Sequence, residues 1–147
     1  MGTVDQEFQS CLSENRVTVF ADGPKLVDRQ LEIASDDLAE AAASAARGAW
    51  KWSTIQSYYS MYHTARALLF ARSFREKNHR CLRIAIASLY AREGEEFASL
   101  VDDFNLGKQL RENAGYADDF SENGAQKLMA SARRFLEAAR TVLGRHA

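Results

Sequence analysis

The sequence contains few residues of the types that build metal sites and disulfide scaffolds. Its 147 residues include two cysteines, Cys11 and Cys81, and three histidines, with no CxxC and no HExxH motif. Two isolated cysteines do not indicate a disulfide framework, and these histidines and cysteines form no recognisable metal motif. We therefore expect no metal and no other cofactor.

The chain also lacks a long apolar run and an excess of charge of either sign. No segment approaches the roughly 20 apolar residues of a membrane-spanning helix, and the polar N-terminus does not resemble a signal peptide. We expect a cytoplasmic protein without membrane association. The net charge of −1 argues against nucleic-acid binding through overall basicity, although it allows a local basic patch.

Helical periodicity accounts for most of the chain, and strand-like alternation is nearly absent. Apolar residues recur from Val27 to Ala45 at steps of three and four, which is typical of one buried helix face. The single proline, Pro24, suits the first turn of that helix. Only Arg16–Phe20 alternates like a strand, and it has no evident partner. We predict helices at Val4–Ser13, Pro24–Gly48, Ser53–Ala71, Arg80–Arg92 and Glu95–Asn113 (ended by Gly115), and from Asn123 onward.

These patterns predict an all-α protein, an antiparallel up-and-down bundle of four to five helices with short loops. The length and the hydrophobic content of 46% fit one domain with a substantial core. We expect residues 1–21 to form an N-terminal arm with a short helix, and residues 22–147 to form the bundle.

The most informative segment is the helix predicted at Ser53–Ala71, whose only formal charge is Arg66. A helix that is almost apolar all round is surrounded by the rest of the fold, so we expect it to be the most buried one. A basic segment follows it directly. This order suggests an anion or nucleotide site, whose candidate ligands are Arg72, Arg75, Lys77, His79 and Arg80.

Three segments resemble the HEPN domain family (higher eukaryotes and prokaryotes nucleotide-binding domain). Leu31–Gly48 contains an A-x-x-D-L-x-x-A core, Ile55–Leu82 contains YYSMYHTARALL before the basic segment, and Leu110–Phe120 reads LRENAGYADDF. The likeness extends over about residues 25–144 and is closest to the small stand-alone branch that is often encoded beside minimal nucleotidyltransferases. It implies a helical bundle that forms a homodimer, with nucleotide or RNA as ligand and a minimal nucleotidyltransferase as partner.

The resemblance also provides a sequence criterion for ribonuclease activity. Many HEPN domains are metal-independent ribonuclease toxins whose Arg-x4–6-His motif lies at the dimer interface. Arg111 occupies the expected position, but residues 112–118 include no histidine. Arg72 and His79 satisfy the spacing in a different loop, so the resemblance favours weak or absent cleavage.

Each candidate site residue has a structural alternative. His79 is either a general base or a polar residue at a helix start. The basic residues around it either bind phosphate or form a solvated loop. On the central helix, Tyr59, His63 and Arg66 share one face, where Arg66 either binds ligand or pairs with an acidic residue. Arg111 and Tyr116 either bind phosphate or hold the central helix by a hydrogen bond.

Three functions therefore remain open. The first is a nucleotide- or RNA-binding HEPN protein of a toxin–antitoxin-like pair. The second is an active endoribonuclease that uses His79 and arginines such as Arg111 across a dimer, and the third is a structural helical adaptor. The missing histidine after Arg111 favours the first over the second, and the basic segment favours it over the third.

Overall fold

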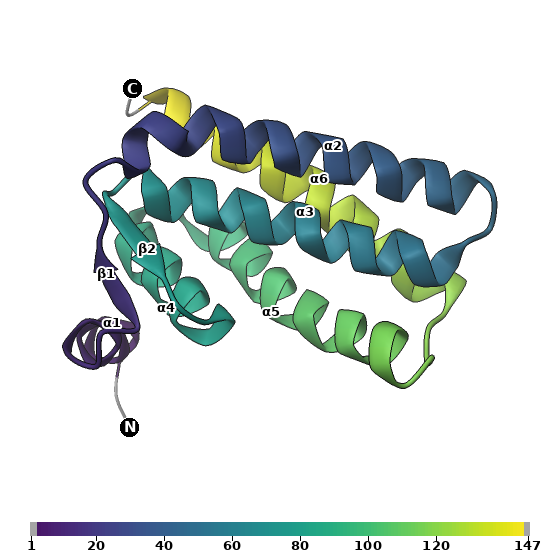
Figure 1. Cartoon of the computed structure of the whole chain (residues 1–147), viewed down its shortest axis with the longest axis horizontal. Helices are drawn as coiled ribbons and strands as arrows, with labels where there is room; N and C mark the ends of the chain where they lie inside the picture. The colour runs from purple at the N-terminus through teal and green to yellow at the C-terminus, as the bar shows by residue number, and fades with distance from the viewer. Residues whose placement is uncertain (1–2, 146–147) are drawn as a thin grey trace.

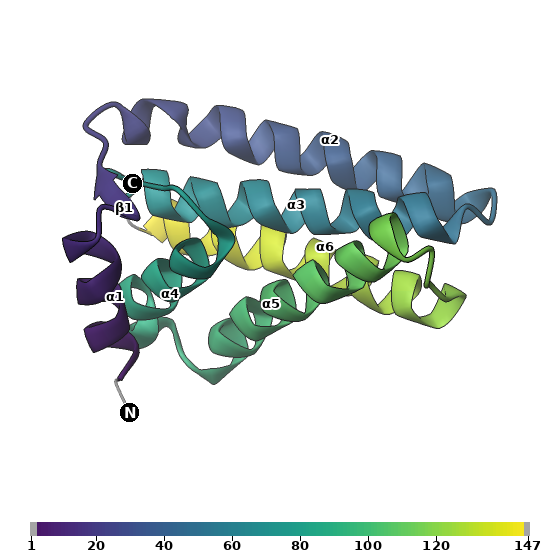
Figure 2. The ribbon, with the colours of Figure 1, turned by 60° about the horizontal axis from the view of Figure 1, so that its bottom comes forward.

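Four long helices run alternately up and down and form the body of the protein. The computed structural model describes residues 3–145, and Figure 1 shows the alternation directly. The helix α5 runs obliquely to the others and packs against α3 and α6 (Figure 2). The prediction of an all-α antiparallel bundle is confirmed. The four helices are α2 (Val27–Ala46), α3 (Trp50–Phe70), α5 (Glu95–Tyr116) and α6 (Glu122–Arg145).

The central helix α3 packs against all three of the others. It buries twelve residues, more than any other described helix, so the prediction that it is the most buried helix is confirmed. Small side chains let α2 approach closely: the Ser53 and Ser60 hydroxyls donate to the Ala41 and Ala34 carbonyls at 2.9 and 2.8 Å. These bonds satisfy hydroxyl groups that would otherwise be costly to bury.

Several helix ends differ from those predicted. Pro24 lies in a 3-10 turn, Gly23–Leu26, before α2 begins at Val27, and α3 begins at Trp50, three residues before the predicted start. The predicted fourth helix continues through Gly115 to Tyr116, because a glycine weakens a helix by only about 1 kcal/mol. The chain reverses at Asp118, whose φ is 52°. The predicted third helix is α4 (His79–Leu89), followed by a 3-10 turn, Ala91–Glu93.

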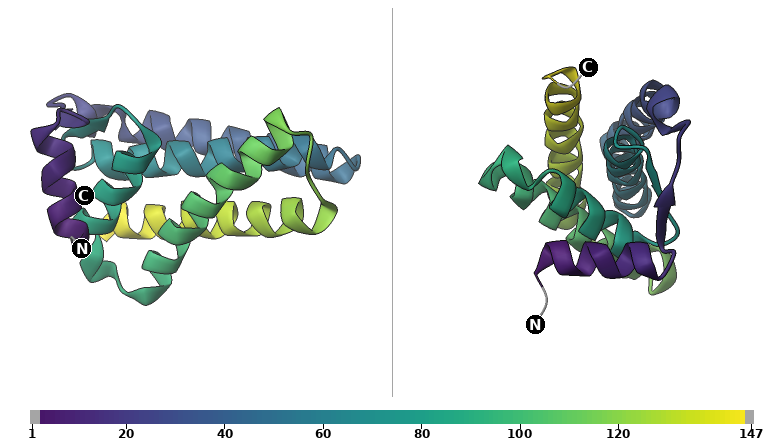
Figure 3. Two further views of the ribbon diagram at one scale, coloured as in Figure 1. Left: turned by 90° about the horizontal axis from the view of Figure 1, so that it is seen from below. Right: turned by 90° about the vertical axis from the view of Figure 1, so that its left-hand side faces the viewer.

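The N-terminal arm consists of α1 (Val4–Ser13), at the predicted position, and the strand β1 (Val17–Val19). The expectation that the strand-like segment lacks a partner is wrong, because β1 pairs antiparallel with β2 (Phe74–Glu76), inside the predicted basic loop. Figure 3 shows α1 lying across one end of the bundle, beside α4. Phe8, Cys11 and Val17 of the arm belong to the same hydrophobic core as the bundle helices.

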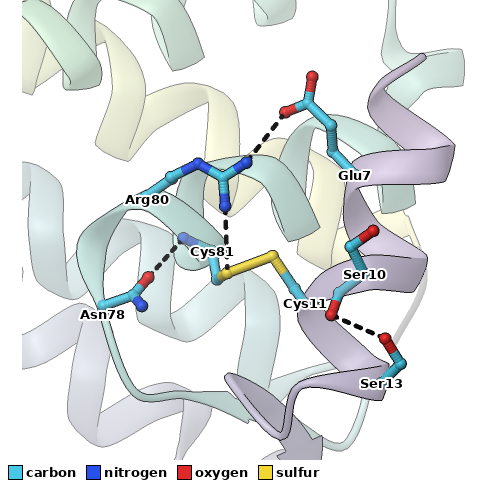
Figure 4. The surroundings of a disulfide bond; sticks show 7 residues. All are labelled: Glu7, Ser10, Cys11, Ser13, Asn78, Arg80 and Cys81. Atoms are coloured by element: carbon cyan, nitrogen blue, oxygen red, sulfur yellow. Dashed lines mark hydrogen bonds and ion pairs between the residues drawn. A yellow bond between two sulfur atoms is a disulfide. The ribbon is translucent and has the colours of Figure 1, made fainter. Parts of the chain in front are cut away.

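The two cysteines form a disulfide that the sequence did not indicate. Cys11 of α1 and Cys81 of α4 are joined across 70 residues of sequence, with their Cα atoms 5.9 Å apart (Figure 4). Pairing of β1 with β2 carries α1 to the start of α4, so both sulfur atoms enter the core. The sequence interpretation that the two cysteines do not indicate a disulfide is therefore corrected.

Residues 3–145 contain neither a membrane-spanning helix nor a cluster of metal-ligating side chains. Every helix in residues 3–145 is too short or too polar to cross a lipid bilayer. The same residues include no cluster of three or more histidine, cysteine or acidic side chains suited to holding a metal ion.

Candidate functional site

A shallow groove between α3 and α5 gathers tyrosines and charged side chains. Its volume is about 240 Å³. The α3 side consists of tyrosines one and three residues apart, and the α5 side of residues spaced by three or four along one helix face. The lining residues are Tyr58, Tyr59, Tyr62, Lys108, Arg111, Glu112 and Tyr116.

Arg111 is held in this groove by two tyrosines. Its Nη2 donates to the Tyr59 hydroxyl at 3.0 Å, and its guanidinium carbon lies 4.7 Å from the centre of the Tyr116 ring. Within residues 3–145, Lys108 pairs with Glu112 at 3.6 Å, whereas Arg111 has no carboxylate partner. A guanidinium carries five N–H donors, so most of them remain available for an anionic ligand.

Exposed aromatic rings flank this guanidinium. Tyr116 is 78% exposed, and Tyr59 is 37% exposed. An exposed ring beside an arginine can stack on a nucleobase while the arginine binds phosphate. The groove therefore offers the two kinds of contact that a nucleotide needs.

His79 lies behind the groove, at the first position of α4. Its Nδ1 is 2.9 Å from the Tyr58 hydroxyl, and its ring centre is 4.4 Å from that of Phe104. Tyr58 lines the groove, so its side chain stands between the groove and the imidazole. The N-cap of α4 is Asn78, whose side chain accepts the Cys81 N–H at 2.8 Å.

The surroundings of His79 favour its neutral form. Burial, together with the positive charges of Lys108 and Arg83, lowers the pKa of His79 to about 4, although Asn105 acts in the opposite direction. Nε2 is buried and makes no hydrogen bond within the described residues. Burial also raises the pKa of Tyr58 above its ordinary value, so the pair is uncharged at neutral pH.

Glu76 of β2 is the one acidic residue of the basic segment, and its role was missed in the sequence. Its side chain is 4% exposed, and its Oε2 accepts from the Tyr62 hydroxyl at 2.8 Å and lies 3.3 Å from Arg66 Nε. The alternative that pairs Arg66 with an acidic residue is thus the one observed. Burial and the Glu76 charge raise the pKa of Tyr62 to about 12. The sequence did contain a signal for this ion pair. Glu76 is the one carboxylate shortly after a helix whose only formal charge is Arg66.

The cations of the basic segment point to different parts of the surface. Arg72 stacks on Tyr90 at 4.4 Å, and Arg75 stacks on Phe20 at 4.7 Å. Lys77 is exposed, and Arg80 faces Glu7 of the arm at 3.8 Å. They do not form one common site.

Two of the predicted site residues, His63 and Arg72, lie on other parts of the protein and not in the groove. His63 pairs with Gln30 of α2 at 2.7 Å. Arg72 lines a larger hollow of about 570 Å³ between α2 and α6, together with Arg140 and Asp28.

Of the predicted site residues, the structure brings Tyr59, Arg111 and Tyr116 together and connects His79 to them through Tyr58. The other lining residues, Tyr58, Tyr62, Lys108 and Glu112, were not among the predicted site residues. The signal for Lys108 was its spacing of three residues from Arg111, which places both on one helix face.

The HEPN domain model matches residues 27–142, which include α2, α3, α5, most of α6 and the groove but not the N-terminal arm. No curated protein matches the sequence significantly.

Proposed function

The chain belongs to the HEPN domain family, and we propose that it binds a nucleotide or an RNA end in the groove between α3 and α5, with weak or no cleavage of RNA. The observation that carries this proposal is Arg111, held between Tyr59 and Tyr116 without a carboxylate partner in the described residues. It would bind phosphate while the exposed Tyr116 ring stacks on a base.

The positions of the histidines support the proposal that the protein cleaves RNA weakly or not at all. Attack by a ribose 2′-hydroxyl needs a base within hydrogen-bond reach of that hydroxyl. Neither histidine among residues 3–145, His63 or His79, lines the groove. The lowered pKa of His79 also makes its neutral imidazole a weak base at pH 7.

An active endoribonuclease is the second candidate, and one contact favours it. The Tyr58 hydroxyl joins His79 to the groove, so a proton could pass from the ligand to the imidazole through Tyr58. A dimer would then have to add arginines from a second copy.

We further propose a cytoplasmic homodimer that pairs with a minimal nucleotidyltransferase in a toxin–antitoxin-like system. Trp52, which is 53% exposed, lies two helical turns before Tyr59 on α3. The exposed Trp52 ring, which does not line the groove, offers apolar area that a second copy would bury. Purification from the native host with identification of bound protein and nucleotide tests the partner.

Binding is tested by anisotropy of a labelled single-stranded RNA and by calorimetry with nucleotides. Arg111→Gln should weaken binding about tenfold or more, because a hydrogen bond to a charged group contributes about 1.5–3 kcal/mol. The matched control is Arg133→Gln, an exposed arginine of α6 outside the groove, which should bind as the wild type does. Loss with Arg72→Gln instead would assign the ligand to the larger hollow.

Cleavage is tested on the same RNA without metal. Wild-type protein should produce little product. Robust cleavage that His79→Ala abolishes would establish the ribonuclease alternative. Absence of both binding and cleavage would leave the structural adaptor.

A further inference from the structure

We propose that the Cys11–Cys81 disulfide is a thiol–disulfide exchange site, through which a dithiol reductant releases the N-terminal arm from the rest of the protein. Both cysteines and the side chains around them are drawn in Figure 4. The proposal depends on the arm being an addition to the bundle and on the unequal surroundings of the two sulfur atoms.

The arm lies outside the HEPN match, which begins at residue 27, and the contacts that hold it bury only three of its described residues, Phe8, Cys11 and Val17. Besides the disulfide and the three-residue β1–β2 ladder, these include an edge contact of Phe8 with Phe74 at 5.8 Å. Two polar contacts join α1 to α4: Ser88 to Asp5 at 2.6 Å and Arg80 to Glu7 at 3.8 Å. A terminal element that buries so few side chains can open without global unfolding once its covalent link is broken.

The two sulfur atoms differ as leaving groups. Cys81 is the third residue of α4, where the helix dipole favours negative charge, and Arg80 Nη1 lies 4.0 Å from its Sγ. Both features stabilise a thiolate on Cys81. Cys11 lies in the third turn of α1 and has no cation among its described contacts. A lower thiol pKa makes a better leaving group, so the bond is polarised for attack at Cys11.

The exchange has two steps. A thiolate of the reductant attacks Cys11 Sγ, a sulfur–sulfur bond forms between them, and the electron pair of the broken disulfide leaves on Cys81. The second thiol of the reductant then attacks the mixed disulfide and releases Cys11. The reductant is oxidised to a disulfide, and the protein gains two electrons and two protons as two thiols.

Burial makes this exchange depend on movement of the arm. Cys11 and Cys81 are each 1% exposed, while the Arg80 side chain beside Cys81 is 61% exposed. A reductant therefore reaches the bond only when α1 moves away from α4. Once the bond is reduced, nothing covalent restores the contact, and the arm is held only by the ladder and the α1–α4 packing.

The arm supports the segment behind the groove. β1 pairs with β2, which carries Glu76, and Cys81 follows His79 by two residues. Release of the arm would loosen the groups that hold Tyr62 and Tyr58. This consequence for ligand binding rests on the proposed function, whereas release of the arm does not.

Hydrogen exchange of the oxidised protein and of protein reduced with dithiothreitol tests the release. Alkylation and mass spectrometry give the redox state of each sample. We expect reduction to accelerate amide exchange in residues 3–19 by at least tenfold more than in α2 and α6, whose amides report only the loss of global stability. The double variant Cys11→Ser, Cys81→Ser should exchange like the reduced protein under oxidising conditions. Unchanged exchange of residues 3–19, or free thiols in air-equilibrated protein, would overturn the proposal.

A second measurement tests the role of Arg80. Arg80→Gln should slow reduction by dithiothreitol roughly threefold, because the leaving thiol loses its cation. The matched control is Glu7→Gln, which breaks the same Arg80–Glu7 contact but keeps the cation beside Cys81. Equal rates of disulfide reduction in the two variants would contradict the inference that Cys81 is the better leaving group.

Nucleotide binding by the oxidised and reduced forms separates the two proposals. Weaker binding after reduction supports coupling of the arm to the groove, and equal binding refutes that coupling. Binding by neither form counts against the proposed function, while the exchange data still decide the release of the arm.

Discussion

The unfolding free energy of the protein should fall between pH 6.5 and pH 4, and replacing His79 with glutamine should make this fall much smaller. Burial holds the pKa of His79 near 4 in the folded state, whereas an unfolded histidine titrates near 6.5. Between these values the unfolded chain binds a proton that the folded chain does not. The contribution of this group is therefore fully present above pH 6.5 and is lost as the pH falls toward 4.

The size of the effect follows from the shift. A lowering from 6.5 to about 4 corresponds to about 3 kcal/mol, because one pKa unit is about 1.4 kcal/mol. The ring is only partly buried, so solvent screening reduces this figure to about 2 kcal/mol. At pH 7 the substitution should itself cost about 1 kcal/mol, because the hydrogen bond with Tyr58 is lost.

Urea unfolding at pH 7 and pH 4.5 measures this difference. Carboxylates titrate in both proteins, so the change in unfolding free energy of the wild type minus that of His79→Gln isolates the imidazole. His63→Gln is the comparison variant: burial and Arg66 also lower the pKa of His63, so a change of the same sign is expected. The same pH dependence in wild type and His79→Gln would refute the burial argument.

Three other predictions concern the carboxylate behind the groove, the disulfide and the oligomeric state. Glu76→Gln should lower the unfolding free energy by about 2 kcal/mol, because it removes a buried charge that holds a guanidinium; the exposed Glu32→Gln should change it by less than about 0.5 kcal/mol. The double variant Cys11→Ser, Cys81→Ser should be about 2–4 kcal/mol less stable than the oxidised protein, because the bond spans 70 residues, and chemical denaturation of the reduced wild type should match it. Sedimentation at micromolar concentration should give a dimer, and a monomer there would contradict the proposed homodimer.

The sequence alone determined the helices and which of them is buried. From Val27 to Ala45 the apolar residues repeat with helical spacing, and α3 carries only Arg66 as a charge, so both features are encoded within one local segment. Helical spacing on α3 marked Tyr59 as a candidate, the resemblance to HEPN domains added Arg111 and Tyr116, and the structure places all three in one groove. Their helices were predictable, but their contacts were not.

Only the tertiary structure decided which distant segments meet. The alternation at Arg16–Phe20 marked β1, but its partner β2 is only three residues long, too short for an alternating pattern to identify it, and their pairing closes a long loop. That pairing brings Cys11 to Cys81 and sets Glu76 against Arg66. It also fixes the start of α4, where His79 packs behind Tyr58 instead of facing solvent among the basic residues. Helical periodicity depends on neighbours within two turns, whereas these contacts depend on how whole elements pack, and no local pattern records that.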